Sequence, residues 1–298
     1  MLKIGTLADL FKIGVINGII ASESCGAQGV QLYAWNELNP MTVSAQKLHE
    51  VKTAASDHGQ KITAICGELS ELKLKGHGLQ DEAFNQPKLE YLKRTIDMAN
   101  ELGANIVTTH IGVVPADASQ ERYRVMSEAC AELDEYAQSN DSWIAIETGP
   151  EKIATLSKFS DQFSNHRIAI NYDPANLVMV TQEDEVEGVY TAGKRIVHTH
   201  AKDGIMKAYL GPEKVYAIFA EGGIESLEKL PDYFMEVPLG EGQVRWVKYI
   251  QALLDINYDG FLTIEREVGA TPDKDIRQAV QFLTNLLESL SDIQRGKK

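Results

Sequence analysis

Cysteine is scarce in this chain of 298 residues, which has only Cys25, Cys66 and Cys130. The three are widely spaced, and no two form a Cys-x-x-Cys motif. A disulfide framework needs paired cysteines, and Cys-x-x-Cys spacing is typical of redox and structural zinc sites. The sequence therefore indicates a protein of a reducing compartment, and a chain of this length can build a core without cross-links.

Long apolar runs are also missing. The stretch 13–21 is apolar, but a helix needs about 20 such residues to cross a bilayer. The first residues lead directly into a strand-like segment, with no hydrophobic region followed by a cleavage site. We therefore expect a cytoplasmic protein that has no membrane partner.

Positive charge is the third shortage. Basic residues number 29 against 43 acidic ones, and the formal net charge is -14. A protein that follows the phosphates of a nucleic acid needs a basic stripe, and anionic membrane surfaces also attract basic segments. The composition therefore disfavours nucleic acid and membrane partners, whereas a small anionic ligand held by a few local cations stays open.

Short apolar runs alternate with longer amphipathic segments from end to end. Strands are predicted at residues 3–6, 30–35, 61–68, 105–112, 143–149, 168–173, 196–203 and 260–265. Helical periodicity follows each strand. Ser44 is the predicted N-cap of one helix, and Pro87 marks the expected start of the next. Eight strand–helix pairs without a break in composition predict a single (β/α)₈ TIM barrel over residues 1–298.

A doubly wound open sheet is the main alternative fold. It would show a glycine-rich phosphate turn after the first strand, and Gly5-Thr-Leu-Ala-Asp does not supply one. The polar segment 204–236, after the seventh strand, is longer than a normal strand–helix loop. In a barrel it would lie at the active-site face, so we expect an extended loop that acts as a lid or as a contact in a homo-oligomer.

Charged side chains end four successive strands. They are Glu147, Asp173, His200 and Glu265. Barrel enzymes carry their chemistry at the C-terminal ends of the strands. Three carboxylates converging there would repel one another, and a divalent cation would remove that conflict. Oxygen ligands with one imidazole favour Mn²⁺, Mg²⁺ or Co²⁺, and Zn²⁺ also fits.

The seventh strand carries further polar groups. His198, His200 and Lys202 alternate along it and therefore share one face. Three cations there would repel, which again favours a metal ion beside a neutral imidazole. Lys202 is predicted to contact a ligand, and its alternative is an ion pair with Glu265 or Asp203.

Other strand ends offer weaker candidates, each with a structural alternative. His110 either bonds a ligand hydroxyl or is a buried structural histidine. Asn176 either donates to a ligand or caps the next helix. Glu68 is as well explained by a solvated loop carboxylate as by a ligand contact. Arg266 should point away from Glu265 and is predicted to form a structural ion pair.

Five segments carry a resemblance to a known family. They are Ile144-Ala-Ile-Glu147, Tyr172-Asp-Pro-Ala-Asn176, His198-Thr-His-Ala-Lys-Asp203, Pro238-Leu-Gly-Glu-Gly242 and Tyr258-Asp-Gly-Phe-Leu-Thr-Ile-Glu-Arg-Glu267. These motifs resemble the xylose isomerase-like TIM barrels, and among them the sugar phosphate isomerases/epimerases. The resemblance implies one divalent metal bound by Glu147, Asp173, His200 and Glu265. It also implies that Glu147 and Glu265 form the acid/base pair and that His198 supports the site or faces the substrate.

The predicted function is therefore a metal-dependent sugar or sugar phosphate isomerase/epimerase, with Mn²⁺ favoured. The metal would polarise a carbonyl and the adjacent hydroxyl and so stabilise a cis-enediolate. One carboxylate would remove a proton and the other would return it. Two carboxylates across a shared ligand are what a ketose epimerase requires. An aldose–ketose isomerase could return the proton with the same base or use a hydride shift, and the sequence does not decide between these. The predicted substrate-binding residues are His110, Asn176, His198, Lys202 and Glu68.

Three alternatives stay open at this point. A dehydratase like those of inositol catabolism would use the same metal and base to expel a hydroxyl. An endonuclease IV-type repair enzyme would need a three-zinc cluster, but Cys66 and Asn176 stand where that family places two histidines. A non-catalytic sugar-binding barrel would not need four intact ligands. Substrate phosphorylation is also open: Gly240 and Gly242 could offer N–H groups to a phosphate, although Glu241 between them argues against an anion.

Overall fold

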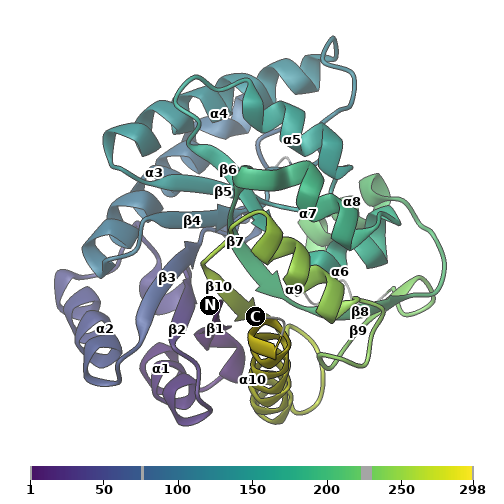
Figure 1. The fold of residues 1–298 in the computed structure, drawn as a ribbon. Helices are drawn as coiled ribbons and strands as arrows, with labels where there is room; N and C mark the ends of the chain where they lie inside the picture. The colour runs from purple at the N-terminus through teal and green to yellow at the C-terminus, as the bar shows by residue number, and fades with distance from the viewer. Residues whose placement is uncertain (1, 75–76, 223–229, 297–298) are drawn as a thin grey trace.

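The computed structural model describes residues 2–74, 77–222 and 230–296, and its centre is a barrel of eight strands (Figure 1). The strands are β1 (Lys3–Leu7), β2 (Gly29–Tyr33), β3 (Lys61–Cys66), β4 (Ile106–Thr109), β5 (Trp143–Glu147), β6 (Ile168–Tyr172), β7 (Ile196–Ala201) and β10 (Phe261–Ile264). Every neighbouring pair is parallel, and the order β1-β10-β7-β6-β5-β4-β3-β2 closes on itself. All C-terminal strand ends therefore meet at one face.

Helices follow the strands and surround the barrel (Figure 1). They are α1 (Val15–Ser24), α2 (Ala45–Asp57), α3 (Glu82–Leu102), α4 (Glu121–Ser139), α5 (Ile153–Asp161), α7 (Glu185–Ala192), α9 (Trp246–Asp255) and α10 (Pro272–Gly296), with a single turn, α6 (Pro174–Asn176), directly after β6. The predicted (β/α)₈ barrel is confirmed. Among the described residues, no helix has both the length and the apolar run that a membrane crossing requires.

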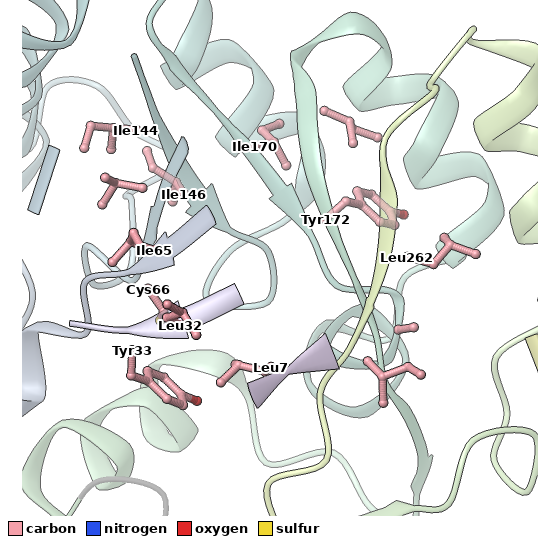
Figure 2. Packing of buried hydrophobic residues seen from close by; sticks show 14 of the residues in the cluster. Leu7, Leu32, Tyr33, Ile65, Cys66, Ile144, Ile146, Ile170, Tyr172 and Leu262 are labelled. Atoms are coloured by element: carbon pink, nitrogen blue, oxygen red, sulfur yellow. The ribbon is translucent and has the colours of Figure 1, made fainter. Parts of the chain in front are cut away.

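Residue alternation separates an apolar outer layer from a polar barrel interior. On β5, Ile144 and Ile146 point away from the side that carries Glu147, because successive strand residues face opposite ways. On β6, Tyr172 similarly points away from Asn171. Figure 2 shows Ile144, Ile146 and Tyr172 among the buried hydrophobic side chains of the core. Apolar packing against the helices thus leaves the inward positions available for functional groups.

Two helix starts test the capping predictions. Ser44 accepts a hydrogen bond from the Lys47 N–H, as its predicted N-cap role requires. The prediction for α3 was wrong, because the helix begins at Glu82 and Pro87 lies inside it. Asp81 caps this earlier start by accepting from the Ala83 N–H. The helix therefore begins before Pro87, although proline cannot donate the hydrogen bond of its turn.

The segment after β7 has structure of its own. It contains β8 (Asp203–Met206), α8 (Pro212–Gly222) and β9 (Phe234–Val237), and β8 pairs with β9 in an antiparallel ladder outside the barrel sheet. Residues 223–229 of the predicted lid fall outside the described part. The extended connection after the seventh strand is confirmed, and its role as a lid or oligomer contact stays a prediction.

Candidate functional site

Four side chains converge at the C-terminal face of the barrel. Glu147 ends β5, Asp173 follows β6, His200 lies near the end of β7, and Glu265 follows β10. All four are buried, and each offers one ligand atom within 4.8 Å of the others. The structure therefore brings together the four residues that the sequence suggested, and this group can hold one metal ion.

Hydrogen bonds from neutral amides hold Glu147. Asn176 Nδ2 donates to its Oε1 at 3.1 Å, and Asn171 Nδ2 donates to its Oε2 at 3.1 Å. Asn176 also donates to the Thr148 carbonyl oxygen at 3.2 Å, which fixes the amide group. Each oxygen of this carboxylate thus accepts from an uncharged amide, and the rings of His200 and His110 lie farther off, at 3.5 and 3.8 Å.

The two carboxylate oxygens of Asp173 have different surroundings. Its Oδ1 accepts from the N–H groups of Ala175 and Asn176 and so caps α6. Its Oδ2 is buried and has no hydrogen-bond partner. A buried carboxylate oxygen without a donor is costly. A cation among these four side chains would satisfy that oxygen, so the donor set fits a divalent metal.

His200 is oriented by a chain of hydrogen bonds across the barrel. Its Nε2 lies 3.0 Å from Gln31 Oε1, and Gln31 Nε2 donates to Thr108 Oγ1 at 2.7 Å. The Gln31 amide oxygen therefore accepts from the imidazole Nε2–H. This leaves Nδ1 turned toward the carboxylates, 3.1 Å from Glu265 Oε2 and 3.5 Å from Glu147 Oε2. Metal-binding histidines are commonly oriented through their other ring nitrogen in this way.

The three carboxylates of the four-residue group repel one another. Burial, with Glu147 and Glu265 nearby, raises the pKa of Asp173 to about 7 despite the opposing charge of Lys202. Burial alone would also raise the pKa values of Glu147 and Glu265, but nearby cations together outweigh burial and lower both. These cations are His200 and His110 for Glu147, and His200 and Lys202 for Glu265. One of three close carboxylates is thus pushed toward its neutral form, which is the strain that a divalent cation relieves.

A cavity of about 300 Å³ opens next to Glu147 and Glu265. Four of the five predicted substrate-binding residues line it: Glu68, His110, Asn176 and Lys202. His110 Nδ1 lies 3.1 Å from Glu68 Oε2, and its Nε2 lies 3.8 Å from Glu147 Oε1. Burial alone would lower the pKa of His110, but the carboxylates of Glu147 and Glu68 outweigh it and raise the pKa to about 9.

His198 is the fifth predicted substrate contact, and the structure does not bring it to this cavity. It is 2% exposed and lies below the four-residue group, inside the barrel. Its Nδ1 is 2.8 Å from Asn171 Oδ1, and its Nε2 is 3.1 Å from Thr263 Oγ1. Burial and the nearby His200 lower its pKa well below the usual value. It is therefore a neutral side chain that supports Asn171, because the β7 register places it one layer too deep to meet a ligand.

Lys202 lines the cavity and is also paired. Its Nζ donates to Glu265 Oε2 at 2.7 Å and to Glu267 Oε2 at 2.5 Å. Arg266 points the other way and bonds Glu236 and Asp275, which confirms the predicted structural ion pair. The interior thus carries one amine between two carboxylates at the end of β10.

The family comparison agrees with the fold. The family model described as xylose isomerase-like TIM barrel matches residues 19–286. The chain belongs to this family. A relative in Escherichia coli (strain K12) is SgbU, which is provisionally named an L-ribulose-5-phosphate 3-epimerase. It is 22% identical over 275 residues, covering 89% of this chain and 88% of SgbU.

Solved structures of this barrel family are also similar. A xylose isomerase domain protein from Planctomyces limnophilus has a TM-score of 0.77 at 23% identity and covers 98% of both chains. The probable 3-DHS dehydratase AsbF from Bacillus anthracis has a TM-score of 0.75 at 17% identity, covering 95% of this chain and 99% of its own. A D-psicose 3-epimerase in the presence of D-fructose has a TM-score of 0.70 at 16% identity, covering 96% and 99%. At these identities the likeness shows the shared fold.

Sequence reasoning missed several residues of this xylose isomerase-like barrel. Asn171 and Gln31 are single polar residues inside apolar strand runs, and each faces the barrel interior. That isolated polarity was a usable signal, particularly for Asn171, which shares a strand face with Asp173. Tyr216 and Glu236 also line the cavity, but they come from the segment after β7. Nothing in strand periodicity indicates which residues of such a segment turn inward.

Proposed function

We propose that this protein is a metal-dependent sugar isomerase or epimerase, most specifically a ketose epimerase. One divalent ion, with Mn²⁺ favoured, would be held by Glu147, Asp173, His200 and Glu265. The observation that carries the proposal is the buried Asp173 Oδ2, which lies without a hydrogen-bond donor among these side chains. Oxygen-rich ligands with one imidazole suit Mn²⁺ or Mg²⁺ better than a soft metal.

A divalent ion in this group would polarise the carbonyl oxygen of a bound sugar and make the neighbouring C–H more acidic. Glu147 and Glu265 are the two bases at the edge of the cavity. In an epimerase, one carboxylate removes the proton from the carbon beside the carbonyl, and the other returns it from the opposite side. The convergence of β5 and β10 on one ligand position supports this division of work.

The two carboxylates differ in what holds them. Glu147 accepts from the neutral amides of Asn171 and Asn176, whereas Glu265 accepts from the ammonium of Lys202. A cation stabilises a carboxylate anion more strongly than an amide does. Both carboxylates also face His200. His110 lies 3.8 Å from Glu147, farther than Lys202 lies from Glu265 at 2.7 Å. We therefore assign Glu147 as the stronger base of the pair.

Three further cavity residues would bind and orient the sugar. His110 is poised to donate to a hydroxyl or to the developing oxyanion, because Glu68 and Glu147 favour its protonated form. Glu68 would fix the ring of His110 and accept from a sugar hydroxyl. Lys202 would donate to a substrate oxygen while it holds Glu265 in place.

The test is solvent exchange. Purified protein loaded with Mn²⁺ is incubated with ketoses in deuterated water, and the recovered sugar is analysed by NMR and mass spectrometry. Deuterium at the carbon next to the carbonyl, dependent on the metal, is the expected result. An isomerase gives an aldose product, an epimerase gives the epimeric ketose, and a dehydratase gives a product lighter by one water. Metal-independent turnover, or no exchange with any ketose, would contradict the proposal.

A further inference from the structure

We infer that this site takes an uncharged substrate, an unphosphorylated ketose or cyclic polyhydroxy ketone, and excludes phosphate esters and carboxylic acids. The inference rests on the proposed function and narrows its substrate class. It comes from the charges around the 300 Å³ cavity, from the main-chain N–H groups of the glycine-rich segment before α9, and from the apolar part of the cavity lining.

Carboxylates dominate the polar lining. Among the described residues, the acidic side chains at the cavity are Glu68, Glu147, Glu236, Glu265 and Glu267. A divalent ion would add positive charge, but that charge would be matched by the three carboxylates proposed to hold it. A phosphate dianion placed here would find no uncompensated positive charge and would lie close to buried carboxylates.

The cations at the cavity are already engaged by protein carboxylates. Lys202 lies between Glu265 and Glu267, at 2.7 Å and 2.5 Å. His110 Nδ1 faces Glu68 Oε2 at 3.1 Å. Arg266, immediately behind the lining, bonds Glu236 and Asp275 at 2.7 Å and 2.8 Å. An incoming anion would have to displace a buried carboxylate from one of these groups.

The main-chain N–H groups that could bind an anion already bind a carboxylate of the protein. The Asp203 carboxylate accepts from the N–H groups of Gly204, Gly240 and Val244, at 2.9, 2.9 and 3.1 Å. It also accepts from Trp246 Nε1 at 2.8 Å. In the sequence, Gly240 and Gly242 of the glycine-rich segment before α9 were the candidate donors to a phosphate. The donors of this segment instead bind a carboxylate of the protein itself.

Part of the cavity lining is apolar. It includes Met179, Val180, Val215, Phe234 and Met235. A surface of this kind packs against the C–H face of a sugar ring and offers an ionic group no hydrogen bonds. The cavity therefore combines polar side chains for hydroxyl and carbonyl oxygens with apolar surface, which suits a neutral polyol.

One cation near the cavity, Arg122, could still bind a phosphate. A second cavity of about 280 Å³ shares Glu68, His110 and Tyr216 with the first, and Arg122 lines it. Arg122 is paired with Glu213 at 2.6 Å. A phosphorylated substrate long enough to reach Arg122 would be the exception, so an Arg122→Gln variant belongs in the test.

The experiment compares matched ligands on the Mn²⁺-loaded protein. L-Ribulose is paired with L-ribulose 5-phosphate, and D-fructose with D-fructose 6-phosphate. Affinity is measured by calorimetry, and turnover by deuterium exchange. We expect the free sugar of a pair to bind and exchange, and its phosphate to do so roughly 100-fold less well. A phosphate that binds better than its sugar, with the preference lost in Arg122→Gln, overturns the inference and leaves the proposed function standing.

A charge variant tests the cause. Glu267→Gln removes one of the carboxylates that neutralise Lys202, and should tighten phosphate binding about tenfold relative to binding of the free sugar. Glu241→Gln removes an exposed carboxylate outside the cavity and should change neither affinity. Equal effects of the two variants contradict the inference. Sugar binding without exchange defeats the proposed function alone, and binding of neither ligand defeats both.

Discussion

His198 and Asn171 form a hydrogen bond inside the barrel, with Nδ1 and Oδ1 2.8 Å apart. Asn171 in turn donates to Glu147 Oε2 at 3.1 Å. The imidazole therefore sets the direction of an amide that holds a proposed catalytic carboxylate. The first histidine of the His-x-His motif thus reaches the site through Asn171 and does not itself line the cavity.

Replacing His198 with leucine should cost both stability and activity. The change leaves Asn171 Oδ1 and the Thr263 hydroxyl buried without their partner, and each such loss costs about 1–3 kcal/mol. We expect the free energy of unfolding in urea to fall by roughly 2–4 kcal/mol. The exchange rate should also fall, because Asn171 no longer fixes Glu147. His49→Leu, at an exposed position, is the matched control. A His198→Leu protein with full rate and a weaker affinity for sugar would instead show direct substrate contact.

Asp173→Asn should separate metal binding from helix capping. Asparagine keeps an oxygen for the N–H groups of Ala175 and Asn176, but it replaces Oδ2 with an amide NH₂ that cannot bind a cation. We expect the affinity for Mn²⁺, measured by calorimetry, to fall on the order of 100-fold or more. The control is Asp184→Asn, because Asp184 caps α7 by the same two bonds far from any proposed ligand. Equal metal affinity in the two variants would remove Asp173 from the ligand set.

The strand ends were accessible from the sequence because they follow a simple rule. Glu147, Asp173, His200 and Glu265 each terminate an apolar run, and parallel strands deliver such residues to one face. The sequence could not show how deep each inward residue sits. His198 and His200 share a face of β7, yet a separation of two residues along the strand places the first beneath the site.

The cavity wall was less accessible for a different reason. Tyr216, Phe234, Met235 and Glu236 come from the segment after β7, whose fold depends on long-range contacts. Asp203 fixes that segment through bonds to Gly240, Val244 and Trp246. Local periodicity in the sequence does not predict such long-range hydrogen bonds. The start of α3 was missed similarly, since Asp81 as a cap competes with Pro87 as a start signal.

Glutamine in place of either proposed base should abolish most turnover. Glu147→Gln and Glu265→Gln remove a proton acceptor with little change in shape, and general base catalysis contributes about 100- to 10,000-fold. We expect each variant to lose that much in the rate of deuterium exchange. Metal content is measured in parallel, because both residues are also proposed ligands. Glu101→Gln, an exposed change, serves as the control. A Glu265→Gln protein that keeps its metal and its full rate would refute the two-base scheme.

Glu151 should make the stability of the fold depend on pH. It is buried, its Oε2 accepts from the Val114 N–H, and its Oε1 has no hydrogen-bond partner. Burial raises the pKa of this carboxyl from 4.5 to about 8. Between these values the folded protein holds a proton that the unfolded chain has lost, so the stability that Glu151 contributes falls as pH rises. The full effect is no more than about 5 kcal/mol.

The variant Glu151→Gln isolates this contribution, because glutamine stays neutral and can still accept from the Val114 N–H. Urea unfolding of both proteins is measured from pH 5 to pH 9. The stability of the variant relative to the parent should rise through that range, and the variant should be the more stable protein at pH 9. Glu101→Gln should run parallel to the parent at every pH. A constant difference between Glu151→Gln and the parent would mean that Glu151 is already ionised in the fold, with its unpaired oxygen satisfied by water.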